Sequence, residues 1–295
     1  MTSLSVELAS RLGAAGLEPA YVEGVARATL AEDLAGGVDV TSAATVPEEQ
    51  ISVADYVARA DGVLAGLLVA EVVMWVASDG TTEFSPVSRD GDSVTRDDVL
   101  AVVRGRTRDL LTAERSSLNL LCHLSGVASL TARWVAEVKG TRAAVRDTRK
   151  TTSGLRALEK YAVRCGGGEN HRMSLSDAAL VKDNHVIAAG GVAEAFLAVR
   201  AQFPGLPVEV EVDELSELSE ALDAGADLVL LDNMDVNTMR AAVSLTAGRA
   251  RLEASGGLSL ANARAVASTG VDYLAVGALT HSAPVLDIAL DLRDV

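Results

Sequence analysis

Cysteine and long apolar runs are both scarce in this 295-residue sequence, and each scarcity excludes a class of protein. Two cysteines, Cys122 and Cys165, are too few for a disulfide framework and lack the spacing of metal ligands. The most apolar stretch, residues 63–77, contains Gly66 and Glu71, whereas a membrane-spanning helix needs about 20 nearly uncharged residues. No basic segment followed by an apolar core is visible at the N-terminus, so no secretory signal is expected. These features predict a soluble, cytoplasmic protein.

Positive charge is scarce overall, because 41 acidic residues outnumber 26 basic ones and give a formal net charge of −15. The average field of such a protein repels nucleic acids, so general nucleic-acid binding is excluded. Residues 142–182 are different, since they hold nine basic and four acidic side chains, a net charge of +5, against −20 elsewhere. This cationic region indicates a pocket for a compact anion. A solvated helix face with scattered ion pairs would give the same count.

The first part of the chain, residues 1–124, has the mixed pattern of an α+β unit. Its helical patterns and strand-like runs cover residues 3–15, 19–34, 52–59 and 99–105. Residues 63–76 fit either a helix or a buried strand.

From residue 125 onward, short apolar strands alternate regularly with helical segments. The strands are predicted at residues 143–147, 178–181, 208–212, 228–231, 251–254 and 273–276. This alternation predicts parallel βα units, either in a barrel or in a doubly wound sheet. Six or seven strands rather than eight predict that a barrel would be incomplete.

Polar residues or glycines follow every predicted strand. They are Thr148-Arg149-Lys150, Lys182-Asp183-Asn184, Glu211 with Asp213, Asp232-Asn233, Ser255-Gly256-Gly257 and Gly277-Ala278. In α/β barrels the active site lies at the carboxyl ends of the strands, and glycine-rich turns after the last two strands often bind a phosphate. The pattern therefore favours a barrel with a phosphate site.

Two basic motifs carry the strongest signal for anion binding. Arg149 and Lys150 combine a planar bidentate donor with a mobile point charge, although an ordinary surface strand can end in the same way. His171 and Arg172 follow three glycines and both can donate to a carboxylate, although a surface loop also explains the glycines. Lys150 or Lys182 could instead form a Schiff base. No dinucleotide-binding or Walker A glycine spacing is present.

Carboxylates form a third group of candidate residues. Glu211 and Asp232, at neighbouring strand ends, suit a divalent cation or sugar hydroxyls. Glu209, Glu211 and Asp213 alternate along one strand face, where the cationic region would supply partners for inward-facing charges. A structural ion-pair network is the alternative. No cluster of histidine and cysteine indicates zinc.

These residues lie in segments that resemble the quinolinate phosphoribosyltransferase family. The matching segments are residues 32–42, 111–121, 148–156, 159–185, 208–213, 230–234, 253–257 and 276–284. Two departures from the family pattern are Ser153, where proline is usual, and Ala275, where serine is frequent. Neither replaces a group with an expected chemical role.

The resemblance implies an α/β fold with two domains: an N-terminal α/β sandwich domain over residues 1–124, joined by residues 285–295, and an open, about seven-stranded α/β barrel over residues 125–284. It also implies a cytoplasmic homodimer that uses magnesium. The implied reaction converts quinolinate and phosphoribosyl pyrophosphate into nicotinate mononucleotide, pyrophosphate and carbon dioxide.

The resemblance also implies roles for individual residues. Arg149, His171 and Arg172 face the quinolinate carboxylates, while Lys150 and Lys182 lie near the pyrophosphate and ribose. Glu211 and Asp232 serve the ribose hydroxyls and magnesium, and with the two lysines they are the expected catalytic residues. The remaining expected substrate contacts are Thr148, Ser255, Gly256, Gly257, Val276, Gly277 and Ala278, several of them around the 5′-phosphate. Arg115, otherwise an ordinary helix charge, is expected to reach into the neighbouring subunit's site.

Three alternatives to this function stay open on the sequence. One is a related enzyme that acts on another heterocyclic acid. Another is a Schiff-base aldolase on a phosphate-binding barrel, and the third is an anion-binding protein without catalytic activity.

Overall fold

A computed structural model of the chain describes residues 3–293. Residues 1–2 and 294–295, the outer ends of the predicted first domain and of its C-terminal segment, lie outside the described residues. The chain divides into two compact units. Among the described residues, the first unit comprises residues 3–130, 152–167 and 282–293, and the second comprises residues 131–151 and 168–281.

The first unit contains an antiparallel sheet with the strand order β12-β1-β5-β3. Its strands are β1 (Ile51–Ala58), β3 (Glu83–Pro86), β5 (Val99–Arg106) and β12 (Ile288–Leu292). Every second side chain of β1, including Ala54 and Tyr56, is buried, as the two-residue period of a strand requires. The Tyr56 hydroxyl donates to Ser117 Oγ at 2.7 Å, so the buried face of the sheet packs against helix α5 (Thr107–Val138). A small second sheet pairs β2 (Gly62–Val63) with β4 (Ser93–Val94).

Among the described residues the first unit has five further helices, and the first three along the chain begin at side-chain N-caps that the sequence provides. The five are α1 (Val6–Ala14), α2 (Pro19–Leu34), α3 (Val40–Thr45), α4 (Leu67–Ala77) and α6 (Arg156–Cys165). Glu18 accepts from the first amides of α2, and Asp39 does the same for α3. Most of the segment 63–76, which fits a helix or a buried strand in sequence, lies in α4, and Asp90 accepts from the Leu67 amide at the first turn of this helix.

The second unit is an open parallel sheet covered by helices. Its strand order is β6-β11-β10-β9-β8-β7, and among the described residues no ladder joins β7 back to β6. The strands are β6 (Ala144–Arg146), β7 (Ala179–Val181), β8 (Val208–Val212), β9 (Leu228–Asp232), β10 (Arg251–Ser255) and β11 (Tyr273–Ala275). A single parallel bridge between Arg146 and Glu169 extends the sheet beyond β6. The predicted combination of an open α/β barrel and a separate N-terminal α/β domain is therefore confirmed.

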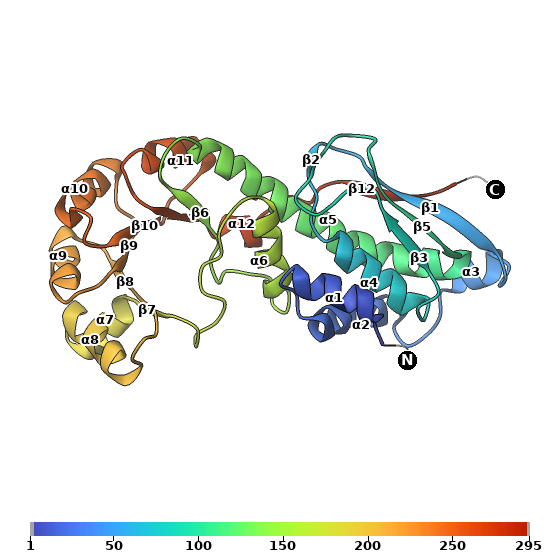
Figure 1. The fold of residues 1–295 in the computed structure, drawn as a ribbon, viewed down its shortest axis with the longest axis horizontal. Helices are drawn as coiled ribbons and strands as arrows, with labels where there is room; N and C mark the ends of the chain where they lie inside the picture. Colours follow the sequence, from blue (N-terminus) through green and yellow to red (C-terminus); the bar gives the residue numbers. More distant parts are fainter. Residues whose placement is uncertain (1–2, 294–295) are drawn as a thin grey trace. The chain divides into compact units, whose positions relative to one another are not determined.

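Helices line the outer side of these strands (Figure 1). They are α7 (Asp183–Ala189), α8 (Val192–Gln202), α9 (Leu215–Asp223), α10 (Val236–Thr246) and α11 (Leu260–Ala267). The short helix α12 (Ala278–His281) follows β11. Helix α9 shows why they pack this way, because Leu218 and Leu222 are buried while the intervening acidic residues face outward. No helix within residues 3–293 is both long enough and apolar enough to cross a membrane.

Candidate active site

A pocket of about 550 Å³ lies at the carboxyl ends of the parallel strands in the second unit. This is the face where an α/β barrel gathers residues from successive strands. Ten of its lining residues are site residues predicted from the sequence: Thr148, Arg149, Lys150, His171, Arg172, Lys182, Glu211, Asp232, Ser255 and Gly256. The remaining lining residues are Leu180, Leu230, Asn233, Glu253 and Ala275.

The turn after β6 holds three of these residues by backbone hydrogen bonds. The Lys150 amide donates to Thr148 Oγ1 at 3.0 Å, and Thr280 Oγ1 donates to the Lys150 carbonyl at 2.7 Å. A Cβ atom at Gly277 would lie 3.0 Å from Lys150 Cδ, so the absence of a side chain there leaves room for the lysine stem. The turn is thus fixed at the mouth of the pocket, and Arg149 lies within it.

Two guanidinium groups make one part of the pocket strongly cationic. Arg172 Nη1 donates to the Ala178 carbonyl at 3.0 Å, which orients the guanidinium. Burial, together with the positive charge of Arg149, lowers the pKa of Arg172. Holding two like charges close together is unfavourable without a counter-ion, so this region favours an anion with more than one negative charge.

Carboxylates form a second part of the pocket. Lys182 Nζ lies 2.5 Å from Glu211 Oε2, and Asn233 Nδ2 donates to Asp232 Oδ2 at 2.7 Å. Partial burial and the charge of nearby carboxylates, Asp232 first among them, raise the pKa of Asp213. This region therefore carries an excess of negative charge, which suits a cation or hydroxyl groups.

A turn with left-handed backbone conformations follows β10, next to Asn233 in the turn after β9. Asn233, Gly256 and Gly257 all adopt left-handed backbone conformations, with φ of +53°, +80° and +60°. A Cβ atom at Gly256 would lie 2.1 Å from Asn233 Oδ1, so no other residue fits without a shift of the asparagine. The Asn233 amide donates to the Ser255 carbonyl at 3.0 Å and ties this turn to the end of β9. Such a turn brings backbone close to a ligand, as a phosphate site requires.

A group of charged side chains with little exposure borders the pocket, and two of them, His171 and Glu253, also line it. Arg146 Nη1 donates to Glu253 Oε2 at 2.8 Å, and His171 Nε2 lies 2.6 Å from Glu209 Oε2 and 3.5 Å from Glu253 Oε1. The Arg146 guanidinium also lies 3.6 Å above the Tyr273 ring. Burial and the charge of Glu209 raise the pKa of Glu253 to about 7. Glu209 and Glu211 therefore find partners in the basic region, as predicted for the alternating carboxylates. Asp213, the third of them, instead lies among carboxylates.

Five predicted site residues lie outside the pocket lining. Gly257, Val276, Gly277 and Ala278 belong to the turns after β10 and β11, and Arg115 is exposed on α5 in the first unit. Glu253, which lines the pocket, was not predicted as a site residue, although it occupies an inward position on β10 two residues before Ser255. Leu180 and Leu230 carry no signal that separates them from ordinary core residues.

The cationic region of residues 142–182 does not form one surface. Arg149, Lys150, Arg172 and Lys182 line the pocket, whereas Arg142 pairs with Asp272 and Arg146 with Glu253. The other three basic residues, Arg156, Lys160 and Arg164, lie on α6 in the first unit. Counting charge along the chain therefore overstates the charge of the pocket, because neighbours in sequence diverge in space.

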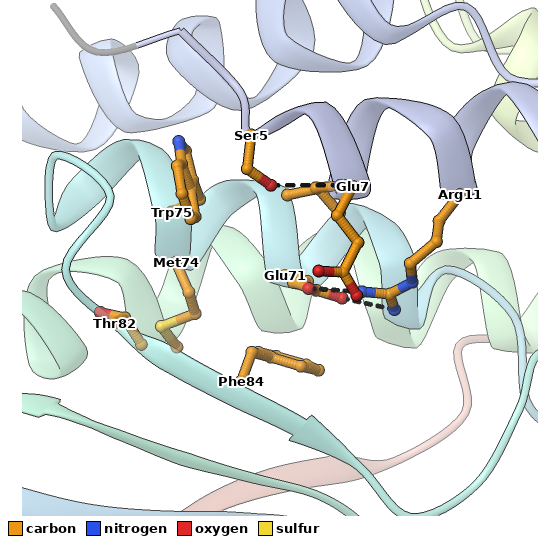
Figure 2. A pocket seen from close by; sticks show the side chains of 9 residues that line it. Ser5, Glu7, Arg11, Glu71, Met74, Trp75, Thr82 and Phe84 are labelled. Atoms are coloured by element: carbon orange, nitrogen blue, oxygen red, sulfur yellow. Dashed lines mark hydrogen bonds and ion pairs between the residues drawn. The ribbon is translucent and has the colours of Figure 1, made fainter.

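A smaller pocket of about 200 Å³ lies in the first unit (Figure 2). Figure 2 shows Arg11 and Glu71 facing each other there, joined by two hydrogen bonds of 2.8 Å. The remaining lining is mixed, with the polar side chains of Ser5, Glu7 and Thr82 beside apolar ones such as Met74, Trp75 and Phe84. Since its principal opposite charges neutralise each other, this pocket lacks the converging charged groups of the barrel site.

Comparison with known proteins gives one consistent result. Family models of the quinolinate phosphoribosyl transferase N-terminal and C-terminal domains match residues 39–125 and 127–291. The chain is 52% identical over 271 residues to the nicotinate-nucleotide pyrophosphorylase (carboxylating) of Mycobacterium leprae, covering 90% of this chain and 95% of that protein.

A plant enzyme and a solved structure agree with this. The mitochondrial quinolinate phosphoribosyltransferase (decarboxylating) 2a of Nicotiana tabacum is 37% identical over 294 residues, covering 93% of this chain and 83% of that protein. The structure of NadC from Streptococcus pyogenes superimposes with a TM-score of 0.89 and 41% identity, covering 94% of this chain and 99% of that one.

Proposed function

Because this chain belongs to the quinolinate phosphoribosyltransferase family, we propose that the barrel pocket is where it transfers the phosphoribosyl group of phosphoribosyl pyrophosphate to quinolinate. The reaction is decarboxylating and yields nicotinate mononucleotide, pyrophosphate and carbon dioxide, a step of NAD biosynthesis. The assignment rests on one observation: a single pocket at the strand ends is lined by two guanidinium groups, two lysines and the carboxylates of Glu211 and Asp232.

Quinolinate binds at the guanidinium part of the pocket. Arg149 and Arg172 supply the positive charge for its two carboxylates, and arginine offers the bidentate geometry that a carboxylate accepts. Leu180, Leu230 and Ala275 give this pocket an apolar wall for the pyridine ring. The proposed orientation places the ring nitrogen towards the carboxylate part of the pocket.

Phosphoribosyl pyrophosphate occupies the other part. The turn of Ser255, Gly256 and Gly257 holds the 5′-phosphate through backbone amides, as glycine-rich turns do in barrel enzymes. Lys150 and Lys182 balance the charge of the pyrophosphate. The neighbouring Thr148, Val276, Gly277 and Ala278 complete the substrate-binding set at the ends of β6 and β11.

Magnesium fits the donor set of the carboxylate part. Glu211 and Asp232 supply the oxygen ligands that this ion prefers, and the raised pKa of Asp213 indicates negative charge in excess of the local cations. When bound, magnesium would offset the charge of the pyrophosphate leaving group.

The residues of the chain stabilise charge as it develops. As the bond between ribose C1 and pyrophosphate breaks, C1 gains positive charge, which the carboxylates of Glu211 and Asp232 favour. Lys150 and Lys182 stabilise the departing negative charge. The quinolinate nitrogen then attacks C1, and the adjacent carboxylate leaves as carbon dioxide. The electron pair of the broken bond stays on the ring carbon, where the neighbouring positive nitrogen stabilises it, and that carbon then takes a proton from water. No covalent bond to the protein is needed.

We further propose a cytoplasmic homodimer in which Arg115 of each subunit reaches the other subunit's pocket. Arg115 is exposed on α5 and does not line the barrel pocket of its own chain. Both cysteines are free thiols, in keeping with a reducing compartment.

One assay tests the function directly. Protein incubated with quinolinate, phosphoribosyl pyrophosphate and magnesium is expected to form nicotinate mononucleotide and carbon dioxide. Nicotinate in place of quinolinate is expected to be a poor substrate, because it lacks one carboxylate for the two guanidiniums. Equal turnover of nicotinate would indicate a related enzyme with another substrate, and borohydride trapping of a carbonyl substrate would indicate an aldolase.

A further inference from the structure

We propose that Glu209 is a positioning residue, which holds His171 in the neutral form protonated at Nε2 and thereby fixes the backbone that carries Arg172. Glu209 does not line the pocket, and only 3% of it is exposed. The consequence for quinolinate binding rests on the function proposed above, whereas the state of His171 does not.

The hydrogen bonds of the imidazole determine where its proton lies. The Arg172 amide donates to His171 Nδ1 at 2.7 Å, so Nδ1 is an acceptor. A neutral imidazole has one donor and one acceptor nitrogen, and the proton is therefore on Nε2. Nε2 then donates to Glu209 Oε2 at 2.6 Å. Both ring nitrogens are thus engaged within the chain.

The same bonds connect Glu209 to the guanidinium part of the pocket. The His171 amide donates to Asp147 Oδ1 at 2.8 Å, and Asn170 Nδ2 donates to Asp147 Oδ2 at 2.6 Å. Asp147 is fully buried, so this side of the segment is anchored. On the other side the segment is held by the imidazole, whose orientation depends on Glu209. Releasing the imidazole therefore loosens the backbone of Arg172.

A metal ion at this position is the principal alternative. Ligand atoms of His171, Glu209 and Glu253 lie within 4.8 Å of one another. A metal on Nε2 would require the proton to move to Nδ1, where the Arg172 amide already points. Arg146 provides Glu253 with a positive partner at 2.8 Å. The hydrogen-bond pattern therefore favours a positioning network over a metal site.

This assignment changes the expected role of His171. The family resemblance suggests that His171 faces a quinolinate carboxylate, but its neutral ring has no second N–H group to donate. The carboxylates are then left to Arg149 and Arg172, and His171 acts through the placement of Arg172. Glu209 acts one step further away, through His171.

Nitrogen NMR of the ligand-free protein tests the state of the imidazole without any assay of activity. The chain has four histidines, so ¹⁵N-histidine labelling gives few signals, and a His171→Gln variant assigns those of His171. At neutral pH we expect one neutral form with Nε2 protonated, retained in Glu209→Gln, whose amide oxygen accepts the same bond, and lost in Glu209→Ala. An Nδ1-protonated or doubly protonated ring would overturn the proposal, as would a shift of the Nε2 signal on adding zinc.

Kinetics test the consequence for the substrate. Glu209→Ala is expected to raise KM for quinolinate about tenfold while kcat and KM for phosphoribosyl pyrophosphate stay within about twofold. In Glu209→Gln, KM for quinolinate is expected to stay near the parent value. A role that depended only on the charge of Glu209, or on metal binding, would raise it. Glu137→Ala, an exposed glutamate of the second unit, controls for loss of an acid.

The two experiments separate the two possible failures. If the parent does not turn over quinolinate, the proposed function fails, and the NMR result still decides the state of His171. An unchanged KM for quinolinate in Glu209→Ala, in an active parent with the expected NMR signals, would overturn the positioning role itself.

Discussion

Gly256 shows how a single residue can shape a site without contributing a side chain. It combines a φ of +80° with a Cβ direction that runs into Asn233 Oδ1. We expect Gly256→Ala to raise KM for phosphoribosyl pyrophosphate by about 10- to 100-fold, because the turn that holds the phosphate must move. Steady-state kinetics with each substrate varied in turn would measure this, and KM for quinolinate should change less.

The matched control is Gly248→Ala. Gly248 also has a positive φ, +77°, but a Cβ atom there would meet nothing within 4 Å. It lies beyond the end of α10 and away from the pocket lining. Similar kinetics for both variants would show that backbone strain in general, rather than the contact with Asn233, causes the effect.

Glu253 gives the protein a pH dependence of known sign. Burial and Glu209 raise its pKa from 4.5 to about 7, so between these values the folded state holds a proton that the unfolded state has released. Stability therefore falls as pH rises through this window. Between pH 4.5 and 7, we expect the free energy of unfolding of Glu253→Gln to fall by about 1–3 kcal/mol less than that of the parent. Urea unfolding at a series of pH values measures this. Parallel pH curves for the two proteins would contradict this.

The site residues divide by how visible they are in the sequence. Arg149, Lys150 and Asp232 could be predicted, because charged residues directly after buried strands are rarely structural on a barrel's carboxyl face. Leu180 and Leu230 could not, since an apolar residue at a strand end looks the same whether it meets a ligand or the core. The proton position on His171 could not either, because it depends on a contact with a distant strand.

Secondary structure elements were easier to predict than their partners. The six barrel strands begin and end within one or two residues of their predicted bounds, because short apolar runs between turn residues define them. Residues 63–76 could not be assigned, since a segment buried on most sides has no periodicity, and they form mainly α4. The pairing of β12 with β1 joins strands far apart in the chain, which no local pattern predicts.

Helix α5 packs against the segment that leads into β12, and a substitution at this contact tests the pairing of β12 with β1. A Cβ atom at Gly126 would lie 2.2 Å from the Pro284 carbonyl oxygen, and the Leu286 amide donates to the Cys122 carbonyl of α5 at 3.0 Å. We expect Gly126→Ala to lower the free energy of unfolding by about 2–4 kcal/mol, because the segment leading to β12 must move away. Urea unfolding measures this.

A helix-favouring substitution elsewhere provides the comparison. Gly24→Ala in α2 adds a Cβ atom with nothing within 4 Å and is expected to stabilise the protein by about 0.5–1 kcal/mol. If Gly126→Ala were equally stabilising, the segment around Pro284 would not be tightly packed on α5.

At the scale of the whole molecule, the net charge of −15 and a pocket for polyanions are compatible because they act over different distances. Salt at physiological concentration screens exposed charges beyond about 8 Å. In the proposed site, a substrate would instead meet the nearby charges of Arg149, Arg172 and the two lysines. The average charge therefore disfavours long nucleic acids but does not determine the binding of small anions.

The proposed exchange of Arg115 between subunits makes a prediction for mixtures. Arg115→Ala and Lys182→Ala are each expected to be nearly inactive. When they are unfolded together and refolded, half of the dimers are mixed, and one of the two pockets in each mixed dimer has both residues. We expect about a quarter of the parent activity to return. Refolding each variant alone is the control, and no recovery in the mixture would place Arg115 in its own subunit's site.

The position of β12 in the first unit's sheet has a consequence for the order in which the protein forms. β1, β3 and β5 precede the second unit along the chain, but β12 follows it, and β12 pairs with β1 over five residues. During synthesis the barrel strands are therefore made before β12, the second neighbour of β1, emerges from the ribosome. Until then β1 presents an open edge, the kind of surface on which nascent chains aggregate. The unit made first is the one that finishes folding last.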